Sequence, residues 1–136
     1  KPFLDEEIKI SFSHTKGYSA AIISGQYEVG IDLELYRPGI RKVARKYMRA
    51  EESKTLQSLT DVEHLLTYWG AKEVMVKITG DRHLDFRKEL RVSPFTYRPL
   101  QKIRDSIYKG NKEKPVRIFC QEVGELYVTL GWEMTW

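Results

Sequence analysis

The first third of the chain consists of short apolar runs separated by turn residues. Residues 8–12 alternate apolar and polar side chains, 19–24 form an apolar run, and 27–34 follow a turn signal at Gly25. A period of two is typical of strands, and glycine-containing turns separate the strands of a hairpin. The pattern predicts three consecutive strands arranged as an antiparallel meander.

The middle of the chain has helical periodicity. Residues 40–48 carry apolar side chains three and four positions apart, 50–59 is typical of a short helix, and 61–78 is the longest helical run. Within these runs we expect Trp69 in the core or in a pocket wall, and His64 at the surface. His83, in the loop that follows, is expected at the surface as well.

The last third returns to strands. Residues 90–95 form one predicted strand, and 116–123 and 126–132 alternate on either side of Gly124, which predicts a hairpin. The polar, lysine-rich segment 97–114 fits a helix or a loop equally well.

Strands, then helices, then strands indicate an α+β fold with an antiparallel sheet packed against the long helix. The length of 136 residues fits a single domain, 1–136. We expect the long helix to cross the sheet and to bring Glu73 beneath the strand that carries Asp32 and Glu34.

The composition indicates the class of partner and the compartment, but it does not identify one partner. The net charge of +4 and the pI of about 9.1 favour anionic partners. No run approaches the ~20 apolar residues of a membrane span, and no secretory signal is visible, so we expect no membrane association. The single cysteine, Cys120, excludes an internal disulfide and is expected to be buried in a cytoplasmic protein.

Two groups of side chains indicate chemistry. Asp32 and Glu34, two apart on a strand, face the same way, whereas Trp69, Glu73 and Lys77, four apart on a helix, share one face. Three converging acids repel one another unless a cation lies between them, and oxygen ligands with a nearby lysine suit Mg²⁺ and a phosphate. The alternatives are a solvated edge strand with two exposed acids and an ordinary helical Glu–Lys pair.

These groups carry a family resemblance. Gly30-Ile31-Asp32-Leu33-Glu34, followed by the segment from Trp69 to Lys77, resembles the G-[IV]-D-x-E and W-x-x-K-E-x-x-x-K signature of the 4'-phosphopantetheinyl transferases. Phe12-Ser13-His14-Thr15 resembles the [NS]-x-S-H-[ST] segment of the longer, surfactin-synthetase-activating branch. Lys1-Pro2 resembles the G-K-P turn before it, and the resemblance extends to about residue 95.

The resemblance implies an enzyme that moves the phosphopantetheine arm of coenzyme A to a serine of an acyl or peptidyl carrier protein. It implies Asp32, Glu34 and Glu73 as Mg²⁺ ligands and Lys77 as the residue that binds the pyrophosphate. Released adenosine 3',5'-bisphosphate is the second product. A general base must accept the serine proton.

Further roles follow from the same resemblance. Ser13, His14 and Lys1 are expected to contact coenzyme A, and Lys72 either contacts substrate or pairs with an acid. Glu52 aligns with a candidate general base. Its neighbour Glu51 cannot be separated from it by sequence, and Glu73 is another candidate for the base.

Two departures from the family pattern stand out. Gly70 occupies a position where the family often has Ser, Thr or Cys. The chain resembles only the linker and second half of the long branch, and it begins with Lys1, so we expect a trimmed or partial product. Either a missing N-terminal half or a homo-oligomer would then complete the site.

A basic helix face offers two interpretations. It is either a docking surface for an acidic carrier protein or an ordinary solvated face; its members are Arg41, Lys42, Arg45, Lys46 and Arg49. A nucleic-acid surface is a third alternative, but exposed interleaved aromatics and groove-reading motifs are missing, so we expect no nucleic acid. A non-catalytic relative that binds a carrier protein or coenzyme A is the alternative to the enzyme.

Overall fold

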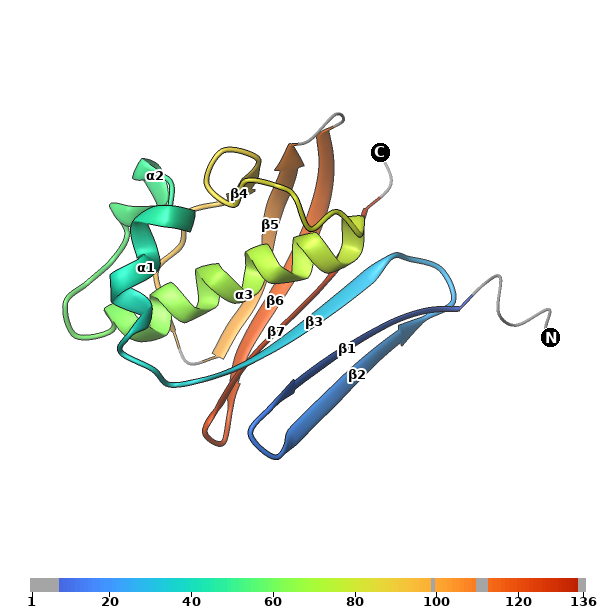
Figure 1. The fold of residues 1–136 in the computed structure, drawn as a ribbon, viewed down its shortest axis with the longest axis horizontal. Helices are drawn as coiled ribbons and strands as arrows, with labels where there is room; N and C mark the ends of the chain where they lie inside the picture. The colour runs from blue at the N-terminus through green and yellow to red at the C-terminus, as the bar shows by residue number, and fades with distance from the viewer. Residues whose placement is uncertain (1–7, 99, 110–112, 135–136) are drawn as a thin grey trace.

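The computed structural model describes residues 8–98, 100–109 and 113–134, and it has the α+β fold that the pattern predicts. The long helix α3 (Asp61–Thr79) crosses one face of an antiparallel sheet with the strand order β3-β7-β6-β5-β4, and a two-stranded hairpin of β1 and β2 lies beside β3 (Figure 1). The bounds are β1 Lys9–Thr15, β2 Tyr18–Ser24, β3 Val29–Leu35, α1 Ile40–Tyr47, α2 Ala50–Ser53, β4 Leu90–Val92, β5 Leu100–Lys109, β6 Glu113–Val123 and β7 Leu126–Glu133.

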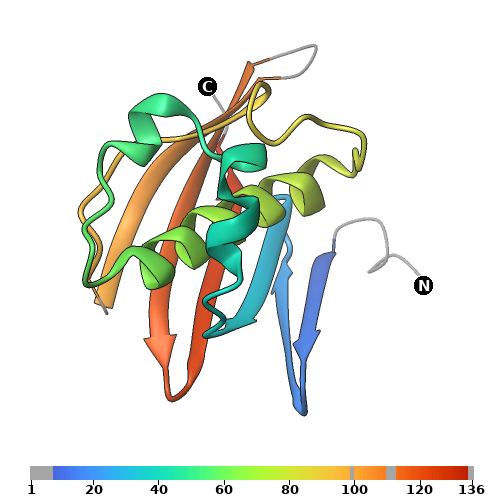
Figure 2. The same cartoon turned by 60° about the vertical axis from the view of Figure 1, so that its left-hand side comes forward.

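The predicted meander is wrong in its third strand. β1 and β2 pair as a hairpin, but β3 pairs with the C-terminal strand β7. β1 runs parallel to β3 and is joined to it through serine hydroxyls: Ser11 Oγ accepts from the Ile31 amide at 3.2 Å and Ser13 Oγ from the Leu33 amide at 3.0 Å. Figure 2 shows the hairpin standing beside β3 as a separate layer.

Glycines let α3 approach the sheet closely. Gly30 on β3 and Gly131 on β7 are register partners. A Cβ at Gly30 would lie 2.7 Å from the backbone oxygen of Val74, and one at Gly131 would lie 3.1 Å from the Val74 side chain. Real Cβ contacts are longer, so the first glycine of the strand motif serves helix packing.

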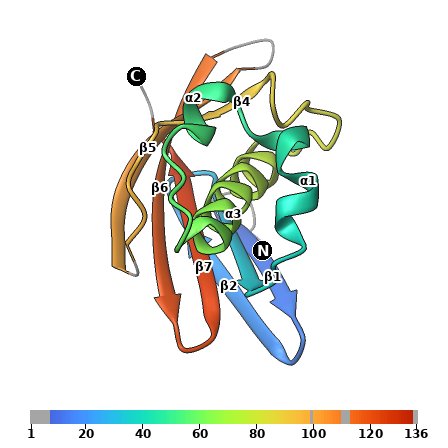
Figure 3. The ribbon, with the colours of Figure 1, turned by 90° about the vertical axis from the view of Figure 1, so that its left-hand side faces the viewer.

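The two short helices lie beside the N-terminal half of α3 (Figure 3). α1 matches its predicted range and buries Ile40 and Tyr47. α2 ends at Ser53, earlier than the predicted helix over 50–59, and Leu59 is 92% exposed. The segment after α2 therefore lacks the buried apolar face that would stabilise a longer helix.

The C-terminal strands match the prediction in part. β6 and β7 form the expected hairpin, with Gly124 at φ 60° in its turn. β4 ends at Val92, before the predicted limit of 95. The unassigned segment contains β5, which pairs with β6.

The predicted position of one histidine is wrong. His64 is buried, stacks on Tyr68 with ring centroids 4.9 Å apart, and contacts Phe95. His83 is exposed, as predicted. Trp69 is half-buried and packs against Phe86, which fits the expected pocket wall. Cys120 is buried, as expected.

Among the described helices, none combines the length and apolar character that crossing a membrane requires.

Candidate active site

α3 is buried on nearly every side, apart from one line of side chains. Between residues 64 and 78, which the structure describes throughout, only Trp69, Glu73 and Lys77 are half-buried. Their spacing of four places them along one stripe, as predicted. The stripe opens toward β1 and β3.

Asp32 lies under this stripe, on β3. Its side chain is buried, so the solvated-strand alternative does not hold for this acid. Oδ2 has no hydrogen-bond partner within the described part of the chain. Burial, followed by a hydrogen bond to Glu34 and the charge of Glu34, raises the pKa of Asp32 to about 10.

The other two acids lie nearby in different settings. Burial raises the pKa of Glu73, Lys77 opposes the shift, and the charge of Glu34 adds to it. Glu34 itself accepts a hydrogen bond from Arg37 at 3.0 Å. No three His, Cys, Asp or Glu side chains of the described residues form a group that is ready to hold a metal ion.

The donor chemistry nevertheless fits a divalent cation. A buried carboxylate oxygen without a partner and two carboxyls with raised pKa values indicate negative charge that lacks compensation. A cation between Asp32 and Glu73 would reverse both shifts. Glu34, which already shares a hydrogen bond with Asp32, would lie within reach of the same cation.

Lys77 joins three parts of the site. Its Nζ donates to the Ile31 carbonyl at 2.6 Å and to the Phe12 carbonyl at 3.0 Å, and it lies 3.9 Å from Asp32 Oδ1. The ammonium therefore bridges β1 and β3 at the acids.

Two open grooves meet at Lys77 and Phe12. One, of about 450 Å³, is lined by Ser13 and His14, so the structure brings these predicted ligand residues to Lys77. The other, of about 830 Å³, is lined by Glu73 and Arg82, with apolar walls from Ile10, Val76 and Phe86. Both grooves lie between the hairpin and α3.

Arg82 and the apolar walls were not predicted. Arg82 follows the helix end at Gly80, where no motif signal marks it. Thr129 was missed as well, and it explains Gly70: a Cβ at Gly70 would lie 2.6 Å from Thr129 Oγ1 and 3.3 Å from Asp32 Oδ2. These contacts depend on tertiary structure, which local sequence does not record.

Glu52 and Lys72 lie away from these grooves, in the interior. Their side chains are fully buried and form an ion pair at 2.8 Å. Burial lowers the pKa of Lys72, and Glu52 opposes that shift. The geometry supports the alternative in which Lys72 pairs with an acid. Lys1 lies outside the described residues.

The predicted basic face is partly engaged. Arg41 pairs with Asp61, and Arg49 pairs with Glu51 and donates to the Arg87 carbonyl. Arg45 is exposed and lines a groove of about 470 Å³ with Arg87 and Lys88. The groove is therefore more basic than the helix pattern alone predicts.

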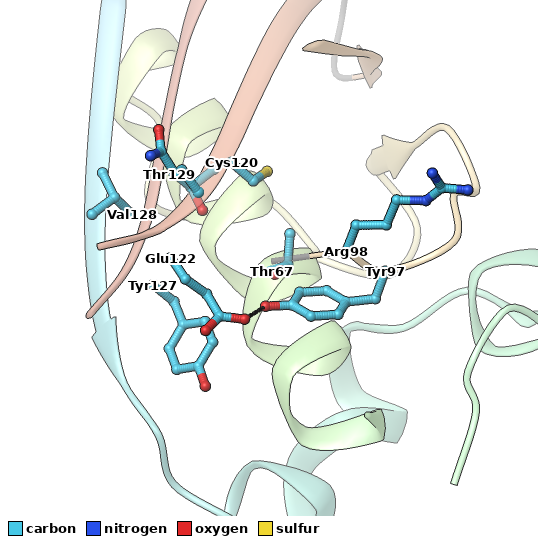
Figure 4. Close-up of a pocket in the computed structure, with 9 residues that line it drawn as sticks. Thr67, Tyr97, Arg98, Cys120, Glu122, Tyr127, Val128 and Thr129 are labelled. Carbon is cyan, nitrogen blue, oxygen red and sulfur yellow. Dashed lines mark hydrogen bonds between the residues drawn. The ribbon is translucent and has the colours of Figure 1, made fainter. Parts of the chain in front are cut away.

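A narrow crevice lies between α3 and the strands β6 and β7 (Figure 4). Tyr97 points into it and donates a hydrogen bond to Glu122. Burial, together with this hydrogen bond, raises the pKa of Tyr97. The crevice contains none of the predicted site residues.

Comparison with known proteins shows the family of the chain. The model of the 4'-phosphopantetheinyl transferase superfamily matches residues 28–130, which include the strand and helix motifs. The chain belongs to this superfamily. A 4'-phosphopantetheinyl transferase, gsp, from Aneurinibacillus migulanus is 30% identical over 130 residues, which are 93% of this chain and 52% of the relative.

A second phosphopantetheinyl transferase, HetI from Nostoc sp., is 29% identical over 84 residues, which are 58% of the chain and 35% of that relative. The chain thus spans about half of the length of one relative and about a third of the other.

Proposed function

We propose that the chain carries the catalytic groups of a phosphopantetheinyl transferase that uses coenzyme A and modifies a serine of a carrier protein. The observation that supports this proposal is that Lys77 and Glu73 line a groove between the hairpin and α3, and that the buried Asp32 lies 3.9 Å from Lys77 beneath it. In this reaction a bond forms between the serine Oγ and the β-phosphorus of coenzyme A. The bond to the bridging oxygen breaks, and adenosine 3',5'-bisphosphate leaves.

Asp32, Glu34 and Glu73 are the proposed Mg²⁺ ligands. When bound, the ion supplies positive charge to pyrophosphate oxygens on which negative charge grows. Asp32 contributes an oxygen that no group among the described residues satisfies. Glu73 lines the groove beside Lys77, and its charge acts on Asp32.

Lys77 is the proposed cation for the pyrophosphate. Its present partners are two neutral carbonyl oxygens, and a phosphate oxygen forms a stronger, charge-assisted bond. Ser13 and His14 line the groove that continues from Lys77, so their hydroxyl and imidazole are placed to donate to further phosphate oxygens.

Glu73 is the base candidate that the geometry favours. Its carboxylate lines an open groove, so the serine hydroxyl of a carrier protein can reach it. Glu52, the base expected from the family pattern, has no open side.

An acidic carrier protein is the proposed partner. The groove of Arg45, Arg87 and Lys88 offers the complementary charge. A nucleic acid would use the same charge, but no stacking platform accompanies it, so the carrier protein is favoured.

A second body is expected to complete the pocket, as a further half or another copy. The hairpin exposes Ile10, Phe12 and Ile23 beside the grooves, with Phe12 66% exposed. Apolar clusters of this kind commonly mark interaction surfaces. A cytoplasmic location remains a prediction.

Calorimetric titration of coenzyme A, with and without Mg²⁺, tests the proposal together with a transfer assay on an apo carrier protein. We expect Mg²⁺-dependent binding and a mass increase of the carrier. Binding without any transfer would favour the non-catalytic relative. Steeply salt-dependent DNA binding without coenzyme A binding would favour the nucleic-acid alternative.

A further inference from the structure

The buried pair of Lys72 and Glu52 connects α3 with the end of α1, with α2, with the loop after α3 and with β4. The three donors of the Lys72 ammonium are all used, by Glu52 Oε1 at 2.8 Å, by the Phe86 carbonyl at 3.0 Å and by the Tyr47 carbonyl. These acceptors lie on α2, on the loop after α3 and at the end of α1. An ammonium has three donors, so this one has none left for a ligand.

Glu52 is satisfied just as fully. Oε1 also accepts from the Arg49 amide at 2.9 Å, at the start of α2, and Oε2 accepts from the Val92 amide at 2.9 Å, on β4. Both side chains have zero exposure. A carboxylate that accepts three hydrogen bonds in the interior is held in one place, and water does not reach it.

Aromatic contacts next to the pair join α3 to the same two segments. Trp69 lies edge-on to Tyr47 at 5.2 Å between ring centroids and stacks on Phe86 at 5.1 Å. These are the two residues whose carbonyls bind Lys72. Backbone and rings of Tyr47 and Phe86 thus hold α3 at two points, Trp69 and Lys72.

We infer that this pair fixes the rotation of α3 about its axis and thereby aims Glu73 and Lys77 into the groove. Successive helical residues differ by about 100°, so anchoring Lys72 sets the direction of Glu73. Lys72 and Glu52 are positioning residues, and neither touches substrate. The inference rests on the proposed function, because it explains how the metal-binding acid is placed.

The test is the dissociation constant of Mn²⁺, measured by paramagnetic resonance on the intact protein and on Lys72→Met. Removing a positive charge beside an acidic site strengthens cation binding by charge alone. Misplacing Glu73 weakens cation binding instead. Removing a residue that orients a metal ligand typically lowers the metal affinity by about tenfold. Weaker binding supports the inference, and equal or tighter binding overturns it. Lys54→Met, which removes an exposed lysine, is the matched control.

The double variant Glu52→Gln/Lys72→Met distinguishes a positioning role of the pair from a role of Glu52 as general base. It leaves no buried charge unpaired, so we expect its Mn²⁺ affinity and turnover to exceed those of Lys72→Met. A general base at Glu52 would instead give Glu52→Gln normal Mn²⁺ affinity with turnover reduced by about a hundredfold or more, and the double variant would be no better. Glu51→Gln is the control for the glutamate.

Amine acetylation followed by mass spectrometry needs no variant, and it covers the case in which Lys72→Met does not fold. We expect Lys54 to react, Lys77 to be protected by coenzyme A, and Lys72 to stay unmodified throughout. A Lys72 that reacts and is then protected by coenzyme A would overturn the inference. A native protein that binds neither Mn²⁺ nor coenzyme A would overturn the proposed function and this role with it, whereas normal Mn²⁺ binding in Lys72→Met overturns the positioning role alone.

Discussion

The ammonium of Lys77 lies 3.9 Å from the carboxylate of Asp32, yet its hydrogen bonds go to the carbonyl of Ile31 and to that of Phe12. The lysine is thus held at the acids without neutralising them fully. A ligand phosphate would find a cation that is already in place.

Lys77→Met should weaken coenzyme A binding by about tenfold or more, because one charge-assisted contact is lost. Calorimetry at two salt concentrations measures the effect, which should shrink as salt rises. Lys54→Met changes the same charge at an exposed position and should leave the affinity unchanged. Unaltered binding in Lys77→Met would return this lysine to a structural role between β1 and α3.

Asp32→Asn should abolish transfer and raise stability in metal-free buffer. The pKa of Asp32 is raised to about 10 on folding, so its favourable contribution holds below the unfolded value near 3.8 and declines as the pH rises toward 10. Thermal unfolding at pH 8 without Mg²⁺ should therefore show a higher Tm for the variant. Asp61→Asn is a contrasting variant: it removes the partner of Arg41, so its Tm should not rise. Retained turnover in Asp32→Asn would contradict the metal assignment.

Gly70→Ala should destabilise the protein despite the better helix propensity of alanine. The propensity gain is about 1 kcal/mol. The new Cβ would lie 2.6 Å from Thr129 Oγ1, and overpacking of this kind costs about 1–3 kcal/mol. Denaturant unfolding of Gly70→Ala, with Gly25→Ala as a control in open space, measures the balance. Thr129→Ala in the same chain should recover stability, and no recovery would exclude this contact as the cause.

Arg45→Glu should raise the KM for carrier protein and leave the KM for coenzyme A unchanged. Arg45 lines the basic groove, whereas Arg49 has local partners whose loss would confuse the result. Lys54→Glu makes the same change of charge outside the groove. Steady-state kinetics with both substrates decide the matter, and equal effects on the two KM values would exclude docking at this face.

The stability of the protein should fall as the pH drops from 6.5 toward 4, in part through His64. Burial lowers the pKa of His64 from 6.5 to about 4, so the unfolded chain binds a proton there before the folded one does. The stabilisation is present above pH 6.5 and lost through this window, by about 3 kcal/mol in all. His64→Phe should flatten the pH dependence of unfolding, and His83→Gln, at an exposed histidine, should not.

Local periodicity is sufficient to predict which site residues share a face when they lie on one helix or one strand. The spacing of Glu73 and Lys77 placed them on one stripe, and the alternation of Asp32 and Glu34 placed both acids on β3. The assignment of catalytic and binding roles to these residues stays a prediction.

Relations between distant segments were not readable. β3 finds its partner in β7 at the other end of the chain, and β5 is polar and becomes a strand by pairing with β6. The sequence marks Glu52 as a candidate base and Lys72 as a candidate substrate contact, but nothing in their spacing of 20 positions indicates that they bind each other. Aromatic neighbours from two segments, rather than local polarity, decide the burial of His64.

The serine hydroxyls between β1 and β3 make the outer wall of the grooves a separate cooperative unit. The hairpin keeps its own ladder, so it can leave β3 while the five-stranded sheet stays intact. The contacts that must break include those of Ser11, Ser13 and Lys77 and the exposed bonds of Lys9 to Glu28 and of Tyr18 to Glu125. Amide hydrogens of Ile31 and Leu33 should therefore exchange with solvent through a sub-global opening of lower free energy than complete unfolding. A ligand bound along Ser13 and Lys77 would slow that exchange without contacting either amide.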